Sequence, residues 1–191
     1  MELSGKIVTL VPMRLHHKEA IVEAASDGKL WELWYTSIPS PNNIEEHIHH
    51  ALEENSADRI LAFVVIENST KKVIGSTRYL HADLIHRRVE IGNTWYSARF
   101  QRTGVNTECK LLLLTHAFEQ LKAIAVEFRT HWHNQVSRSA IARLGAKQDG
   151  ILRNHQIGVD GTYRDTVVFS IIESEWPTVK KSLKLRLEKN S

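Results

Sequence analysis

The chain has 191 residues, a net charge of +3, 42% hydrophobic residues and 25% charged residues. This length suits one domain with a substantial core, and the composition is that of a folded protein rather than a disordered one. Acidic and basic residues are intermixed, which argues against a nucleic-acid binder but leaves an anionic small molecule compatible. Because neither an export signal nor a membrane-length apolar run is present, we expect a cytoplasmic protein with no membrane partner.

The single cysteine, Cys109, excludes an internal disulfide. It lies within a leucine-rich segment that reads as a buried helix, so a small buried thiol is favoured over a nucleophile. This fits a reducing compartment.

The first half of the chain predicts a strand, two helices and three further strands. A strand over Ile7–Met13 precedes a helix over Lys18–Ala25, and Asn43, with Glu46 at the reciprocal capping position, begins the second helix. Short connections then favour an antiparallel meander of three strands: Leu61–Glu67, Val73–Leu80 and Val89–Tyr96.

The second half begins with the leucine helix, from about Gly104 to Gln120. A strand over Ala123–Arg129 and a helix from about Gln135 to Leu144, stopped by Gly145, imply a parallel strand pair. The elements that follow are a hairpin turning at Asp160 and Gly161, with strands Ile151–Gly158 and Tyr163–Ile172, and a terminal helix over about 174–188.

The summed order predicts the α/β (α+β) class: one domain over residues 1–191, with a mixed, mostly antiparallel sheet and helices on its faces. No Gly-, Pro- or Ser-rich linker indicates a second domain.

The segment QRTGVN, before the leucine helix, permits two interpretations. Thr103 can cap the helix, although no Glu or Gln completes a capping box. The same segment can instead present backbone N–H groups to an anion at the helix N-terminus. These residues alone leave both interpretations open.

Four segments in order resemble the GCN5-related N-acetyltransferase (GNAT) superfamily, and within it the ribosomal-protein-alanine acetyltransferase (RimJ/RimL-like) group. They are EIGNTWY, QRTGVNTE, FRTHWHNQVSRSAIARLGA and DGTYRDTVVFSI. The resemblance covers nearly the whole chain, and its specific part runs from Glu90 to Phe169.

The resemblance implies a coenzyme A site. The superfamily's pyrophosphate motif falls on Gln101, Gly104 and Asn106, and Asn106 departs from the small residue expected there. The phosphate-binding segment would comprise Gln101, Arg102, Thr103, Gly104, Val105, Asn106 and Thr107.

The superfamily also splays the strand before this segment from the strand after it and places the pantetheine arm between them. Thr94, Trp95 and Tyr96 would then bind the arm through their main chain, and Gly92 fits a bulge or a kink. Asn134 resembles the asparagine that holds the pantetheine amide, and it can also cap its helix.

Acetyl transfer requires a neutral amine and a proton for the departing thiolate. On the resemblance, Glu90 is the candidate base, and its alternative is a surface ion pair with Arg87 or Arg88. The tyrosine that many members use as the acid is replaced by Ile141, so Ser137 becomes the candidate donor and cofactor contact. Its alternative is a helix-start serine that caps its own backbone.

The acceptor side is less defined. Trp31 and Trp34 fall where the superfamily places part of the acceptor wall, although such aromatics more often form core. Arg78 is a candidate from the third strand, and Arg164 with Asp165 from the hairpin. The histidines at positions 47, 49, 50, 131 and 133 make a poor metal signature, so no metal is expected.

These observations together predict an acetyl-CoA-dependent N-acetyltransferase that acts on a small-molecule amine or a protein N-terminus through a ternary complex. A non-catalytic acyl-CoA-binding module remains the alternative, favoured by Ile141. The terminal hairpin offers an edge for a homodimer.

Overall fold

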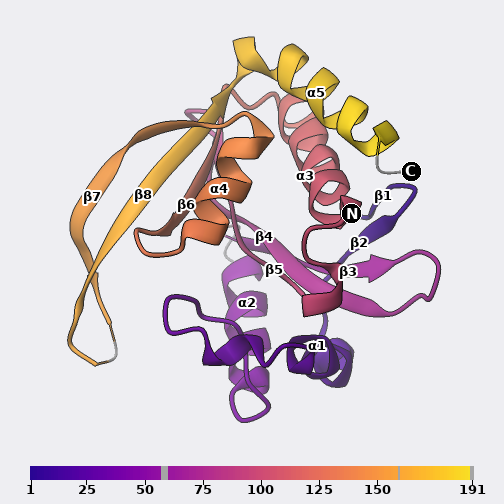
Figure 1. Cartoon of the computed structure of the whole chain (residues 1–191), viewed down its shortest axis with the longest axis vertical. Helices are drawn as coiled ribbons and strands as arrows, with labels where there is room; N and C mark the ends of the chain where they lie inside the picture. The colour runs from indigo at the N-terminus through magenta and orange to yellow at the C-terminus, as the bar shows by residue number, and fades with distance from the viewer. Residues whose placement is uncertain (57–59, 159, 190–191) are drawn as a thin grey trace.

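The computed structural model describes residues 1–56, 60–158 and 160–189, and one eight-stranded sheet forms its centre (Figure 1). The strand order is β1-β2-β3-β4-β5-β6-β8-β7, and β5 and β6 are the parallel pair in an otherwise antiparallel sheet. The predicted fold class is therefore confirmed. The strands are β1 (Leu3–Ser4), β2 (Val8–Pro12), β3 (Ile60–Glu67), β4 (Val73–Asp83), β5 (Arg88–Tyr96), β6 (Ala125–His131), β7 (Lys147–Ile157) and β8 (Tyr163–Ile172).

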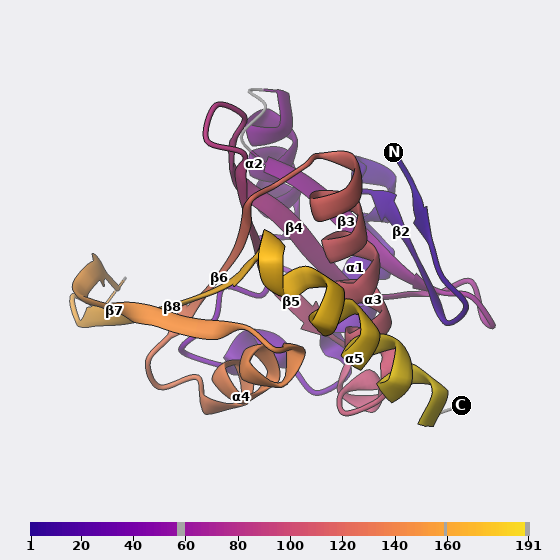
Figure 2. The same ribbon diagram turned by 90° about the horizontal axis from the view of Figure 1, so that it is seen from above.

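Helices cover both faces of the sheet (Figures 1 and 2). Side chains of α3, α4 and α5 join one hydrophobic core, and side chains of α1 and α2 join a second core. Successive side chains of β3 point alternately into the two cores, since Phe63 belongs to the first core and Val64 to the second. The helices are α1 (Lys18–Ser26), α2 (Ile44–Ser56), α3 (Gly104–Thr115), α4 (Gln135–Leu144) and α5 (Trp176–Lys189).

The leucine helix α3 is anchored by its buried face. Leu113 and Leu114 are fully buried, and burial of each such side chain stabilises the fold by about 1.5–3 kcal/mol. Thr103 caps the helix, because its hydroxyl accepts a hydrogen bond from the Val105 N–H at 3.3 Å. The helix widens into a π-helical segment at His116–Gln120, before β6. The N-terminus of α3 is therefore held in a fixed position.

Strand β5 carries the predicted bulge beside Gly92. Its pairing with β4 passes from Arg78 opposite Gly92 to Ser76 opposite Trp95, which leaves an extra residue on β5. Asn93 takes up the change with φ 46°. A Cβ on Gly92 would lie 2.7 Å from Leu80 Cδ1, so a larger residue here would require the Leu80 side chain to shift.

The parallel pair is short. Backbone pairing joins β5 to β6 only over Arg88–Glu90 and Ala125–Glu127. Beyond Glu90 the two strands diverge, so the edge of β5 that faces β6 has no strand partner in the described chain. This is the predicted splay.

Several boundaries differ from the predictions. Strand β1 was not predicted, and it pairs with β2. Beside this pair the buried carboxylate of Glu108 accepts hydrogen bonds from the backbone N–H groups of Lys6, Ile7 and Val8, where the connection enters β2. Strand β6 begins two residues later than predicted, and β7 begins at Lys147, directly after the left-handed Gly145 (φ 103°) ends α4. Asn43 precedes α2 as expected, but its side-chain oxygen accepts hydrogen bonds from Ser40.

Candidate functional site

The loop between β5 and α3 is tied back to β5. Gln101 donates from Nε2 to the Tyr96 carbonyl at 3.2 Å, and Arg102 adopts the left-handed region with φ 62°. The next residue, Thr103, is the helix cap. Both interpretations of QRTGVN are thus compatible with the fold, because the cap engages one N–H of the first turn while the segment remains at the surface.

Asn106, the residue that departs from the superfamily motif, has a partner inside the protein. Its Oδ1 accepts a hydrogen bond from the buried Tyr96 hydroxyl at 3.2 Å. Burial holds the pKa of Tyr96 well above its usual value, so this hydroxyl remains a donor. The Asn106 side chain is therefore directed to β5 and keeps the first turn of α3 in register with the strand.

The side chains of Trp95 and Tyr96 are buried in opposite cores. What this part of β5 offers to a ligand in the splay is consequently its main chain, and the main-chain contact of Thr94, Trp95 and Tyr96 with the cofactor stays a prediction. The Thr94 hydroxyl is also engaged, because it lies 2.8 Å from Thr77 Oγ1 and accepts a hydrogen bond from Lys110 Nζ at 2.5 Å.

Lys110 is a buried residue that the sequence interpretation did not single out. It lies on α3 with 4% exposure. Burial lowers its pKa to about 8. The sequence feature that could have indicated this burial is the position of Lys110 among the buried positions of an amphipathic helix.

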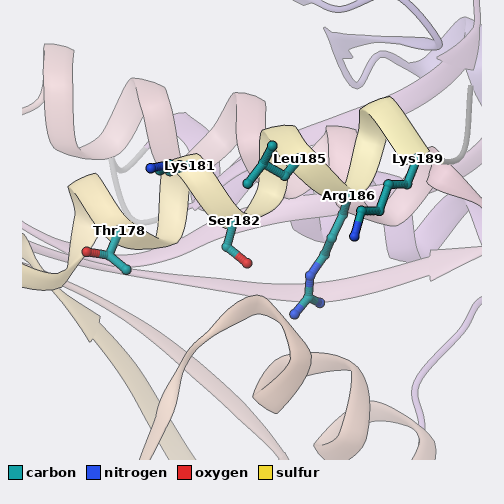
Figure 3. Close-up of a pocket in the computed structure, with 6 residues that line it drawn as sticks. All are labelled: Thr178, Lys181, Ser182, Leu185, Arg186 and Lys189. Atoms are coloured by element: carbon teal, nitrogen blue, oxygen red, sulfur yellow. The ribbon is translucent and has the colours of Figure 1, made fainter.

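Helix α5 supplies a second feature that was missed. Leu187 lies against the start of α3, since a Cβ on Gly104 would be 3.6 Å from Leu187 Cδ2. Arg186 extends from α5 toward α4, where it donates to the Arg143 carbonyl (Figure 3). The sequence could have indicated this group of side chains, because Ser182, Arg186 and Lys189 have the spacing of neighbours on one face of the predicted terminal helix. These side chains border a surface pocket lined by Thr178, Lys181, Ser182, Leu185, Arg186 and Lys189.

Glu90 lies at the last paired position before the splay, with 6% exposure. Its neighbours Val89 and Ile91 join the core beside α3, so Glu90 faces the side of the sheet covered by α1 and α2. Its Oε2 lies 2.9 Å from His81 Nδ1 and 3.5 Å from Arg129 Nε. The alternative of a surface pair with Arg87 or Arg88 is wrong, because Glu90 is buried with other partners.

Arg88 instead pairs with Glu127 on β6, at 2.5 Å. Glu127 also binds Arg129, at 3.0 Å. Burial alone would raise the pKa of Glu127, but the two guanidinium groups outweigh it and lower the pKa. A chain of ion pairs thus connects the surface to Glu90.

Asn134 is the N-cap of α4, and its Oδ1 accepts a hydrogen bond from the Ser137 N–H at 3.0 Å. The cap role considered for Ser137 therefore belongs to Asn134. No hydrogen bond joins Ser137 to Glu90 within the described residues, and the two lie on elements that flank the splay. Ile141 is buried in the core, with 8% exposure.

The acceptor candidates separate into core and surface residues. Trp31 packs against the core under α1 and α2, as the core alternative predicts. Trp34 is 71% exposed, and its ring centroid lies 5.0 Å from that of His131 on β6. Arg78 is 3% exposed and contacts His47 of α2. On the hairpin, Asp165 is occupied by an ion pair with Arg153 at 2.6 Å.

Over residues 1–56, 60–158 and 160–189, no cluster of three His, Cys, Asp or Glu side chains could hold a metal ion. Nor is any helix in those ranges long and apolar enough to cross a bilayer. Strand β7 is a sheet edge, and the homodimer at this hairpin stays a prediction.

Comparison with known proteins identifies the class. A family model of the acetyltransferase (GNAT) domain matches residues 8–147, so the chain belongs to the GNAT acetyltransferase family.

Three similar proteins can be compared in detail. YdaF of Bacillus subtilis, provisionally named a ribosomal N-acetyltransferase, is 32% identical over 94 residues. The match spans 49% of this chain and 50% of the length of YdaF. A structure from T. thermophilus, provisionally named an acetyltransferase, is 31% identical with TM-score 0.84, covering 97% of this chain and 96% of that one. Mycobacterium smegmatis RimJ, solved with CoA-disulfide, shares the fold at 20% identity with TM-score 0.81, covering 97% and 94%.

Proposed function

We propose that this chain is an acetyl-CoA-dependent N-acetyltransferase that moves an acetyl group to a primary amine, of a small molecule or a protein N-terminus, by direct transfer in a ternary complex. The observation that carries the proposal is the position of Glu90, a buried carboxylate at the point where β5 and β6 separate. Membership of the GNAT family and the coenzyme bound to RimJ support the choice of donor.

The residues present fit this donor. The unpaired edge of β5 offers main-chain groups for an extended arm, and the start of α3 together with the α5 cations suits phosphates. Acetyl-CoA supplies the activated acetyl group when it is bound. Asn134 would hold the arm from α4, in addition to capping that helix.

Glu90 accepts a proton from the acceptor amine, directly or through water, because only the neutral amine is a nucleophile. The Ser137 hydroxyl donates a hydrogen bond to the sulfur that departs. Cys109 has no covalent role, since it is fully buried and burial raises the pKa of its thiol.

Acetyl-CoA at about 100 times its Kd is expected to stabilise the protein by about 2.7 kcal/mol, which corresponds to a rise in Tm of roughly 5–10 °C for a domain of this size. Differential scanning fluorimetry measures the rise, and a panel of amines and peptides assayed for thiol release then measures turnover. An unchanged Tm at saturation would contradict the cofactor assignment. A rise in Tm without thiol release from any amine would favour the non-catalytic module that Ile141 suggests.

The α5 cations Arg186 and Lys189 are expected to recognise the 3′-phosphate of coenzyme A, since they lie on the helix whose Leu187 packs beside the start of α3. Arg186→Gln and Lys189→Gln should each weaken binding of coenzyme A by roughly 3- to 10-fold, as expected for loss of one charge-assisted contact. Binding of 3′-dephospho-coenzyme A should change little. Lys184→Gln, an exposed cation on the same helix that does not line the pocket, is the control. Equal losses for both ligands in isothermal titration calorimetry would exclude this contact.

A further inference from the structure

Arg78 is the most deeply buried guanidinium near the candidate site. It lies on β4 with 3% exposure, and its Nη2 contacts His47 Nε2 of α2 at 2.5 Å. Its Nε is buried and has no hydrogen-bond partner in the described chain. A buried donor without a partner costs free energy, so such groups usually have a partner when the protein is at work.

The charge of Arg78 also has no ion-pair partner among the residues that the structure describes. Burial, and then the charge of Arg78 itself, lowers the pKa of His47 to about 4, so the imidazole is neutral at pH 7 and accepts the hydrogen bond. Burial lowers the pKa of Arg78 to about 10, which still leaves the guanidinium charged. Across the described residues, no carboxylate forms an ion pair with Arg78. A buried cation of this kind is costly in free energy unless an anion binds beside it.

A second guanidinium repeats the pattern. Arg164 on β8 is half-buried, and its Nε is likewise buried without a partner among the described residues. Val167 and Phe169 of β8 join the core beside α3, so Arg164 belongs to the opposite face, which Glu90 shares. Burial lowers the pKa of Arg164, and the charge of Glu90 opposes that shift. Arg164 therefore lies within electrostatic range of the candidate base.

Arg78 and Glu90 occupy neighbouring positions on one face of the sheet. Glu90 pairs with Leu80, and Arg78 pairs with Gly92, which makes Arg78 and Glu90 diagonal neighbours with Cα atoms about 7–8 Å apart. Gly92 has no side chain, and the place that a Cβ would take lies 3.1 Å from Glu90 Oε1 and 2.7 Å from Leu80 Cδ1. The two charged side chains therefore lie beside one another on the face that α1 and α2 cover.

The excess positive charge continues around Glu90. The chain of ion pairs holds Arg88, Arg129 and two carboxylates, Glu90 and Glu127, while Arg78 and Arg164 add two further cations. A simple alkylamine would bring another positive charge to this face. An amine that carries its own anion would instead balance it.

We propose that the acceptor amine carries an anionic group, a carboxylate or a phosphate close to the nitrogen, which binds the Arg78 guanidinium while Glu90 receives the proton of the amine. Arg164 contacts the same anion or lies beside it. This inference rests on the proposed function and narrows the acceptor class. It assigns Arg78 to substrate recognition and not to the cofactor, whose phosphates belong on the α3 side of the sheet.

The experiment compares matched pairs of acceptors with acetyl-CoA in the thiol-release assay. Amino acids are paired with their amides, and phosphoethanolamine is paired with ethanolamine, so that one pair type tests carboxylate and the other tests phosphate. The wild-type protein should prefer the anionic member of at least one pair type by 10-fold or more in kcat/KM. Arg78→Gln should remove that preference by lowering kcat/KM for the anionic member alone, and Arg78→Lys should restore part of it.

Arg99→Gln, which removes a guanidinium from a surface pair with Asp27, is the matched control and should leave the preference unchanged. If Arg78→Gln fails to fold, the Tm of the wild-type protein is measured with each member of the acceptor pairs. Only the anionic member of a pair should raise this Tm. Equal use of neutral and anionic amines, with Arg78→Gln lowering both equally, would overturn the inference and leave the acetyltransferase proposal intact. Binding of acetyl-CoA without turnover of any amine would overturn both.

Discussion

Glu90→Gln is expected to lower kcat by about 100-fold or more, the range found when a positioned general base is removed. The amide keeps the size of the side chain but cannot accept the proton of the amine. Because Glu90 faces away from α3, the affinity for acetyl-CoA should stay within roughly 2-fold of the wild type. Thiol release at saturating substrates measures the first quantity, and the acetyl-CoA-dependent rise in Tm measures the second.

Two variants calibrate this result. Glu127→Gln alters the carboxylate opposite Glu90 on β6 and should lower kcat by less than about 10-fold, because it removes the ion pairs with Arg88 and Arg129 but leaves Glu90 itself in place. Ser137→Ala should cost about 10-fold, as expected for loss of a hydrogen bond made in the transition state. If Glu90→Gln keeps more than half of the activity, the base is another group or water.

Lys110→Met is expected to stabilise the fold at pH 7 by about 3 kcal/mol, the free energy that corresponds to the lowered pKa of Lys110. The lysine is enclosed on α3, and the partners of its charge are the hydroxyls of Thr77 and Thr94. Those hydroxyls also hydrogen-bond each other at 2.8 Å, so they keep a partner when the ammonium is removed. Urea unfolding at pH 7 measures the gain.

The pH dependence gives a second measurement on the same residue. Lys110 loses its proton near pH 8 in the folded chain and near 10.5 in the unfolded chain. Between these values the unfolded chain binds more protons, so stability of the wild type should rise with pH across this window. Lys110→Met should lack this rise, whereas the exposed Lys184→Met should retain it. A destabilised Lys110→Met protein would mean that the ammonium contributes to the fold.

The order of elements and the fold class were predictable because hydrophobic periodicity, turn residues and helix caps are local properties. Asn134 and Gly145 marked the two ends of α4 correctly, and Gly92 marked the bulge. The alternation of strands and helices predicted the parallel pair, whereas the splay beyond Glu90 followed from the resemblance to a known family, since no local pattern shows where two strands separate.

The contacts of the candidate site were less predictable, because they join residues distant in the sequence. The alternative considered for Glu90 paired it with its sequence neighbours Arg87 or Arg88, yet Glu90 contacts His81 on β4 and Arg129 on β6. The pairing of β4 with β5 is irregular between Leu80 and Asp83, and His81 has φ 49°, so no regular alternation would have placed it there. Likewise, Glu108 binds a backbone turn about one hundred positions earlier. Register, and not composition, decides these contacts.

The extra residue of β5 divides the strand into two segments whose side chains alternate independently. It shifts the phase of alternation, so that Glu90 and Trp95 point to the α1 and α2 layer while Ile91 and Tyr96 point to the α3 layer. Removal of Asn93 would leave Trp95 two positions beyond Gly92, still opposite Ser76, so Trp95 and Tyr96 would keep their cores and the pairing with β4 would become regular. The strand thus joins two segments of opposite phase, one carrying the candidate base and the other the main-chain edge for the donor. Substitutions can tune either segment separately, because the bulge lies between them.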